Sequence, residues 1–135
     1  MCETAWPPAS VRILAPDARR LDREELVALG SARVSGRGRS AVLDRCRHMV
    51  ALAGDVVAGM AAFELELGEL RAYELVVEPP NDEVLTELVT ALELACLAAG
   101  GHRIFISAHA SIGSGALARF GYEPAGERWL EKGVA

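Results

Sequence analysis

The feature that constrains the fold most is a long stretch of helical periodicity at residues 80–101, framed by two strand patterns. The segments "LRAYELVV" (70–77) before it and "RIFISA" (103–108) after it are apolar runs typical of buried strands. A helix between two such strands predicts a crossover connection within one sheet. The apolar residues that carry the helical spacing are Val84, Leu85, Leu88, Val89, Leu92, Cys96 and Ala99.

The junction between the first of these strands and the helix is unusual. Asn81 or Asp82 can cap the helix, and the following glycine pair at its far end stops it. Junctions of this kind often bind phosphate, which favours glycines and a positive charge. The stretch "EPPNDE" has no glycine and no basic residue. The acids along this junction and the first helical turns are Glu78, Asp82, Glu83 and Glu87.

Shorter patterns complete the chain. Two-residue turns at Gly54-Asp55 and Gly68-Glu69 predict two consecutive hairpins before the long helix. The whole order predicts a mixed α/β or α+β sheet with helices on its faces. The remaining segments are strands at 11–14, 48–53, 56–67 and 127–132, helices at 21–30 and 113–121, a loop at 31–40 and helical turns directly after that loop.

The composition fits a single cytoplasmic domain. At 135 residues and 51% hydrophobic content the chain can bury a core, and we expect a loose segment at 1–10 and one domain at 11–135. A net charge of −5 argues against nucleic-acid and anionic-membrane binding. No apolar run approaches the ~20 residues of a membrane span, and the N-terminus lacks a signal-peptide pattern. Three widely spaced cysteines fit reduced thiols better than a disulfide framework.

Three segments together resemble the GNAT superfamily of acyl-CoA-dependent N-acyltransferases. "GDVVAGMAAF" is similar to the family's second hairpin, and "AYELVVEPP" to its fourth strand. "GALARFGYEPAGERWLEK" resembles its last helix, glycine-aromatic turn and final strands. The resemblance covers nearly the whole chain. It implies a twisted sheet that is antiparallel through its first four strands and parallel at a splay between the fourth and fifth.

The resemblance also implies a place for acetyl-CoA or another acyl-CoA as co-substrate. The family sets the pantetheine arm along the backbone of the fourth strand, here Leu75, Val76 and Val77. It holds the pyrophosphate at the start of the following helix, here Asp82, Glu83 and Val84, by a loop rich in glycine and arginine. This chain has a shorter loop with two carboxylates there, which repel a pyrophosphate.

Two further family positions differ. The last helix of the family often carries a tyrosine that protonates the departing thiolate, and Leu117 occupies that position here. An asparagine common in the preceding loop is replaced by Ala110. These departures favour weakened or lost CoA binding over an ordinary site.

Glu74 is the candidate catalytic residue. With the second turn as predicted, Phe63 faces Glu74, and Glu66 faces Arg71 in a plausible cross-strand ion pair. Desolvation on an apolar face would raise the pKa of the carboxyl and make it a better base, and the family often uses a glutamate on this strand to deprotonate the amine. The alternative is a buried glutamate satisfied by a helix N–H or water. The apolar neighbours on this face are Phe63, Leu65, Leu67, Leu70, Ala72 and Val76.

The histidines give weaker candidates. His48 faces Ala61 in the predicted register and lies diagonal to Glu74, although a sheet-edge histidine is the simpler interpretation. His109 ends a strand, where ligands are often approached, but a loop histidine is the simpler interpretation. The three histidines are too far apart to predict a metal site.

Two loops remain as anion-binding candidates. Ser111 or Ser114 could cap the short helix that follows them, beside glycines that leave the backbone open. Arg37 and Arg39 form the basic cluster "SGRGR", which could meet phosphates or an acidic partner. A solvated loop is the simpler interpretation of each.

Two functional hypotheses follow. The first is an acyl-CoA-dependent N-acyltransferase acting on a small-molecule or protein amine, with Glu74 as the base and backbone N–H groups of the splay polarising the carbonyl. The second is a non-catalytic GNAT-like module that binds another ligand or a partner chain in the same groove. A homodimer is compatible with both.

Overall fold

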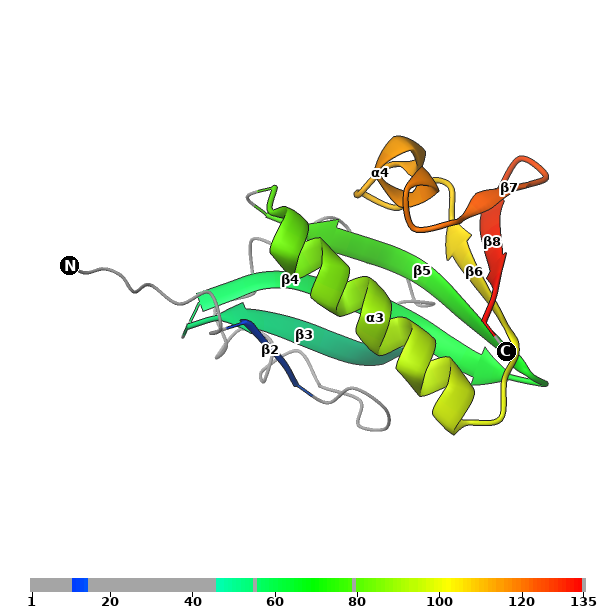
Figure 1. The fold of residues 1–135 in the computed structure, drawn as a ribbon, viewed down its shortest axis with the longest axis horizontal. Coiled ribbons are helices and arrows are strands. Elements are labelled where there is room, and N and C mark those ends of the chain that lie inside the picture. The colour runs from blue at the N-terminus through cyan, green and yellow to red at the C-terminus, as the bar shows by residue number, and fades with distance from the viewer. Residues whose placement is uncertain (1–10, 15–45, 55, 79, 135) are drawn as a thin grey trace.

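The computed structural model describes residues 11–14, 46–54, 56–78 and 80–134 (Figure 1). Within these residues, seven strands form one sheet in the order β2-β3-β4-β5-β6-β8-β7. The predictions for 1–10, 21–30 and 31–40 lie outside the described residues, as do residues 41–45 of the predicted helical turns at 41–47. The helical turns are wrong at Arg47, which is a strand residue. The elements are β2 (Val11–Leu14), β3 (Arg47–Ala53), β4 (Val56–Glu66), β5 (Glu69–Val77), α3 (Asp82–Ala98), β6 (Arg103–Ser107), α4 (Ser114–Ala118), β7 (Glu123–Ala125) and β8 (Trp129–Gly133).

The predicted crossover is confirmed. Strands β2 to β5 are antiparallel neighbours, and α3 carries the chain to β6, which runs parallel to β5. The parallel pairing joins only Glu69–Ala72 to Arg103–Ile106. Beyond these residues the two strands are not paired with each other, which is the expected splay (Figure 1). Strand β7, a three-residue partner of β8, was not predicted.

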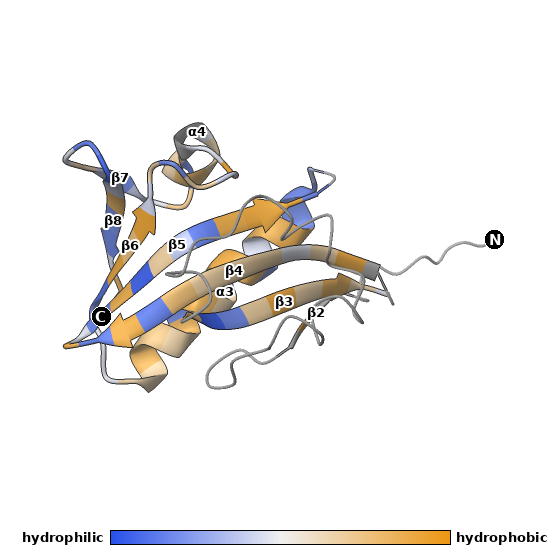
Figure 2. Cartoon of the chain, turned by 180° about the vertical axis from the view of Figure 1, so that it is seen from behind, coloured by the Kyte–Doolittle hydropathy of each residue, from blue (hydrophilic) through white to orange (hydrophobic). Residues whose placement is uncertain are grey.

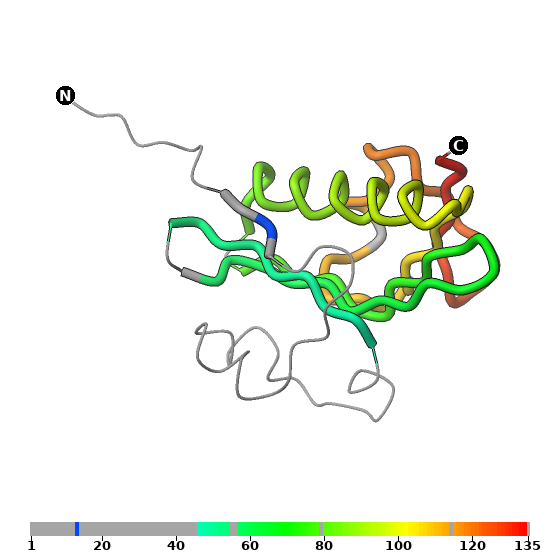
Figure 3. Tube along the Cα trace, turned by 90° about the horizontal axis from the view of Figure 1, so that it is seen from below, coloured from blue at the N-terminus to red at the C-terminus, as the bar shows by residue number. Residues whose placement is uncertain are grey.

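Helix α3 packs along one face of the sheet (Figure 3). Six of its seven predicted apolar positions are buried, including Cys96. The prediction is wrong for Ala99, which is the exposed C-cap residue, and Ala95 is buried in addition. Gly59 in β4 allows the close approach, because a Cβ there would lie 2.7 Å from the carbonyl oxygen of Val76 and 2.9 Å from Cδ1 of Leu88. A larger residue at this position would push the helix off the sheet.

The register of the second hairpin differs from the prediction. Its turn is Leu67-Gly68, not Gly68-Glu69, so Glu66 pairs with Glu69. Leu67 has φ 52°, a left-handed conformation that leucine rarely adopts, so no sequence pattern predicts it at this position. Arg71 consequently lies opposite Glu64 and bonds to Glu69 at 2.8 Å, while its distance to Glu66 is 4.0 Å.

A β-bulge in β5 changes which residues share a face. Phe63 pairs with Ala72 and Ala62 with Glu74, so Tyr73 is the extra residue. Before the bulge, Leu70 and Ala72 face α3, and after it Leu75 and Val77 do. The predicted apolar face for Glu74 is therefore wrong, because the extra residue turns the following side chains over.

The sheet buries apolar residues on both faces. The cluster under α3 is the larger. Figure 2 shows the opposite face, which none of the described helices crosses. No helix among these described segments is long and apolar enough to cross a membrane. The buried residues of the second face are Cys46, Val50, Leu52, Val57, Met60, Ala62 and Val76.

Candidate functional site

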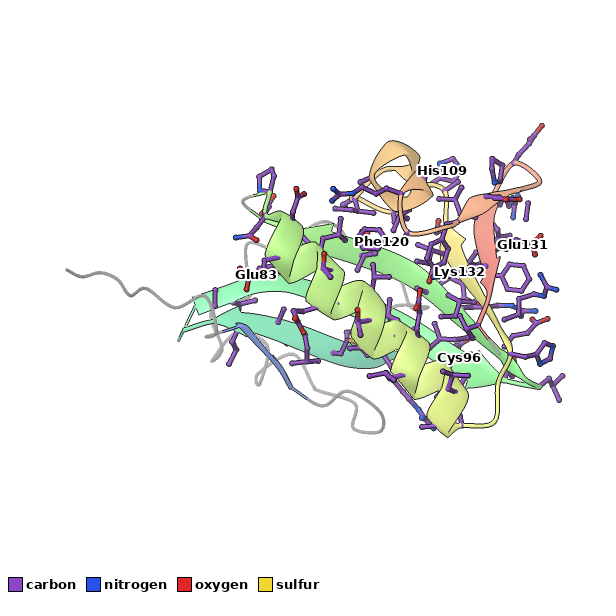
Figure 4. The ribbon with its side chains drawn as sticks, viewed as in Figure 1. Glu83, Cys96, His109, Phe120, Glu131 and Lys132 are labelled. Atoms are coloured by element: carbon purple, nitrogen blue, oxygen red, sulfur yellow. The ribbon has the colours of Figure 1, made fainter. Side chains whose placement is uncertain are left out.

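The candidate site lies where β5 separates from β6. It is bordered by the end of β5, the N-terminus of α3, residues 108–113 and α4. Figure 4 labels Glu83 at the first turn of α3 and His109 beside α4. The splay thus brings together the predicted residues of β5 and α3.

The backbone of Leu75 faces this splay and is already hydrogen-bonded. Its N–H donates to Oε1 of Glu74 at 2.9 Å. Its carbonyl oxygen accepts a hydrogen bond from the N–H of Ile112 at 3.0 Å. Because backbone groups alternate along a strand, those of Val77 point to the same side, and those of Val76 point to β4. The first of the predicted backbone contacts for a ligand is therefore occupied within the chain.

Glu74 is a partly exposed carboxylate that holds a loop. Besides the N–H of Leu75, it accepts the N–H of Ser111 at 2.7 Å and the hydroxyl of Ser111 at 3.2 Å. The expected setting on an apolar face beside Phe63 is wrong, since Ala62 is its partner across the sheet. Glu74 lies beside the splay through its bonds to Ser111, and its role as a base stays a prediction.

The N-terminus of α3 is capped by a side chain. Oδ1 of Asn81 accepts the N–H groups of Glu83 at 2.9 Å and Val84 at 3.0 Å. Of the two predicted caps, Asn81 is the one used. Val84 turns its side chain into the core and is fully buried. Two of the amides that such a helix start offers to an anion, those of Glu83 and Val84, are therefore already satisfied.

An ion pair joins α3 to the end of α4. The guanidinium of Arg119 lies 2.8 Å from Oδ1 of Asp82, and it also stacks over Phe120, with 5.3 Å from Cζ to the ring centroid. The Asp82 side chain is 82% exposed, so the pair lies at the surface. The guanidinium of Arg119 at the helix start is therefore already paired with a carboxylate.

Sequence reasoning did not find Arg119 or Ile112. Arg119 is 37 residues from Asp82, and Ser111 is 37 residues from Glu74, so no local pattern relates either pair. The only hint of a changed site in the sequence was the loop "EPPNDE" before the long helix. It lacks the glycines and the arginine of a phosphate-binding loop.

No protein-family model matches the chain, and no curated protein matches it. Solved structures do match it. PaiA N-acetyltransferase from Thermoplasma acidophilum, in complex with coenzyme A, has a TM-score of 0.65 at 15% identity, covering 92% of this chain and 99% of that one. The ribosomal-protein-S18-alanine N-acetyltransferase from Escherichia coli has a TM-score of 0.66 at 12% identity, covering 93% and 94%. The aminoglycoside 6'-N-acetyltransferase from Enterococcus faecium has a TM-score of 0.53 at 16% identity, covering 65% and 74%.

The chain has the GNAT fold. At these identities the likeness shows the fold alone, and the chemistry depends on the residues of the site. The GNAT fold implies coenzyme A, whose pyrophosphate needs free amides and positive charge. Here Asn81 occupies the amides, Asp82 and Glu83 add negative charge, and Arg119 is paired with Asp82. The residues present do not fit the pyrophosphate of coenzyme A.

The two other family positions are part of the core. Leu117 is fully buried and Ala110 is 7% exposed. The glycine-aromatic turn is confirmed, because Gly121 has φ 94° and Tyr122 is buried behind it. None of these three side chains offers a proton donor to the splay, since the Tyr122 hydroxyl bonds to Glu93.

His48 lies closer to the row of Glu74 than predicted. It pairs with Ala62, not Ala61, and Ala62 pairs in turn with Glu74, so the three lie in one row across β3, β4 and β5. A bulge between Ala51 and Leu52 causes the difference. His48 is buried, with 6% exposure, which is also unlike the expected edge position.

Of the remaining candidates, Ser111 lies at the splay, where it donates to Glu74. The short helix α4 begins at Ser114, with Gly113 as its N-cap residue and no side-chain hydrogen bond at the cap, so Ser111 does not cap it as predicted. His109 is exposed in its loop. Arg37 and Arg39 lie outside the described residues. In the part of the chain that the structure describes, no group of three or more His, Cys, Asp or Glu side chains could hold a metal.

Proposed function

We propose that this GNAT-fold chain is a non-catalytic binding module that does not use acyl-CoA as a co-substrate. The observation that carries the proposal is the Asn81 cap, whose Oδ1 occupies the N–H groups of Glu83 and Val84. These are the amides on which a GNAT-type pyrophosphate site depends.

The energetics support the same conclusion. A phosphate that displaced Asn81 would exchange one set of hydrogen bonds for another, so little net free energy would be gained. The acids Glu78, Asp82, Glu83 and Glu87 are exposed around the same end of the splay. Their field disfavours anions, including nucleic acids, and favours uncharged or cationic ligands.

The test is calorimetric titration of the full chain with acetyl-CoA and with desulfo-CoA, at low and at moderate salt. We expect no binding of either compound at millimolar concentration. Micromolar binding of both would overturn the proposal. A loss of that binding at moderate salt would further show that a positive group, not the α3 amides, holds the phosphates.

A second candidate is an acyl-CoA-dependent N-acyltransferase that acts on the primary amine of a small molecule or a protein. It is favoured by the bulge at Tyr73, which places the Glu74 carboxylate at the splay. The structural neighbours are also N-acetyltransferases of the GNAT type. In such an enzyme, Glu74 would accept the proton of the attacking amine, directly or through water.

This candidate is tested by turnover assays with acetyl-CoA and a panel of amines. Glu74→Gln should lower turnover strongly, whereas Glu78→Gln, an exposed acid near the end of the same strand, should not. Because Glu74 also holds Ser111, thermal unfolding of each variant must accompany the assay. Equal turnover in the wild type and Glu74→Gln would remove Glu74 from the mechanism.

A further inference from the structure

Residues 108–113 cross the splay and are fixed at both sides. The N–H of Ala108 donates to the carbonyl oxygen of Arg128, which directly precedes β8, at 2.8 Å. On the other side, Ser111 and Ile112 donate to Glu74 and to the carbonyl oxygen of Leu75. The segment therefore ties the two diverging halves of the sheet together.

Residues 108–113 bond to the edge of β5 beyond the point where its pairing with β6 ends. Strand β6 pairs with β5 only as far as Ala72. Three residues further along β5, the N–H of Ile112 bonds to Leu75, as a neighbouring strand would do. An extended ligand that added to the edge of β5 would need the same carbonyl oxygen. Residues 108–113 and such a ligand are thus mutually exclusive at Leu75.

The polar contacts of the segment lie near the surface, whereas Ala110 belongs to the core and Ile112 packs against it, so release of the segment must expose both side chains. Ser111 is exposed, and Glu74 is only partly buried. Gly113, at the end of the segment, has φ 83°, and a Cβ placed on it would meet no atom within 4 Å. A glycine with free space around it can change its backbone angles at low cost, so the segment has a natural hinge.

We propose that residues 108–113 are an autoinhibitory segment that occupies the edge of β5 in place of a ligand. The inference rests on the proposed function, in which the splay is closed to phosphate at the start of α3. The segment would close the same splay at the edge of β5. A ligand that replaces the segment must supply amide groups in an extended chain. It must also carry no negative charge near Asp82 and Glu83.

Pantetheine is the probe, because it carries two amides and no phosphate, and coenzyme A is the comparison. Ile112→Pro removes the N–H that bonds to Leu75, and Glu74→Ala removes the acceptor of Ser111. One hydrogen bond contributes about twofold to tenfold to an equilibrium. We expect each variant to bind pantetheine about fivefold more tightly than the wild type. His109→Ala, which changes an exposed side chain of the same segment, should bind like the wild type.

The outcomes separate the two proposals. Tight binding of coenzyme A by the wild type would overturn the proposed function. Folded variants that bind pantetheine no better than the wild type would overturn the autoinhibitory segment. If neither variant folds, hydrogen exchange in the wild type decides. The Ile112 amide should then exchange through a local opening that denaturant does not accelerate, and exchange only through global unfolding would overturn the inference.

Discussion

At the scale of single residues, the Asn81 side chain decides both the stability of α3 and the state of the site. Its Oδ1 accepts two helix N–H groups. We expect Asn81→Ala to lower the free energy of unfolding by about 1 kcal/mol, measured by urea denaturation. Asn81→Asp keeps an acceptor and should cost less. If Asn81→Ala leaves stability unchanged, the cap does not hold these amides, and the main support for a closed phosphate site is lost.

Another residue-scale prediction concerns Tyr122 at high pH. Burial first, and then the Glu93 carboxylate that its hydroxyl contacts at 3.2 Å, raise the pKa of Tyr122 above its ordinary value of 10.0. The unfolded chain loses this proton at lower pH than the folded chain. The stability from Tyr122 is therefore fully present below pH 10.0 and decreases as pH rises above it.

The comparison with Tyr122→Phe isolates this effect. Between about pH 9 and about pH 11, the free energy of unfolding should fall more steeply in the wild type than in Tyr122→Phe. Tyr73, whose pKa is also raised by burial, is common to both proteins and cancels. Parallel pH dependence in the two proteins would show that Tyr122 ionises alike in the folded and unfolded states.

At the scale of elements, the β4–β5 hairpin stores avoidable strain. Leu67 occupies a left-handed position in the turn and is 96% exposed. A left-handed backbone costs most residues about 1–2 kcal/mol, and asparagine tolerates it better. Leu67→Asn should raise the free energy of unfolding by up to about 1 kcal/mol. The matched change Leu94→Asn, on the exposed side of α3, should not stabilise the protein, because that position is helical.

The elements themselves could be predicted well from the sequence, and their registers could not. The period of α3 and the apolar runs of β5 and β6 identified the crossover, because burial imposes those periods. The turn at Leu67-Gly68 was misplaced because both of its residues have positive φ, a conformation that leucine rarely adopts, so Leu-Gly does not stand out as a hairpin signal. The bulge at Tyr73 leaves no mark in the apolar pattern, so Glu74 was assigned to the wrong face.

At the scale of the whole molecule, the sequence indicated weakened or lost binding of coenzyme A but not the long-range contacts that lie at the splay. The departures in "EPPNDE" could be read locally. The contacts of Arg119 with Asp82 and of Ile112 with Leu75 depend on the folded sheet, which brings the last helix and its preceding loop against β5 and α3. The contacts that we propose to close the splay therefore depend on the tertiary structure. One lies at the start of α3 and the other at the edge of β5.

The contacts at the α3 end and at the β5 end of the splay should together reduce the affinity for coenzyme A. Its phosphates would lie at the α3 end, and its amide-bearing arm would lie along β5. Asp82→Ser frees Arg119 beside the phosphate position, and Ile112→Pro frees the carbonyl oxygen of Leu75. Each single variant leaves the other end closed, so its gain in coenzyme A affinity should be small. The double variant should gain more than the product of the single gains, as calorimetry can measure. Glu87→Gln, which removes an exposed charge one turn further along α3, controls for net charge. Single gains that simply multiply would show that the two ends close the splay independently, because coupling between the ends is what joint closure requires.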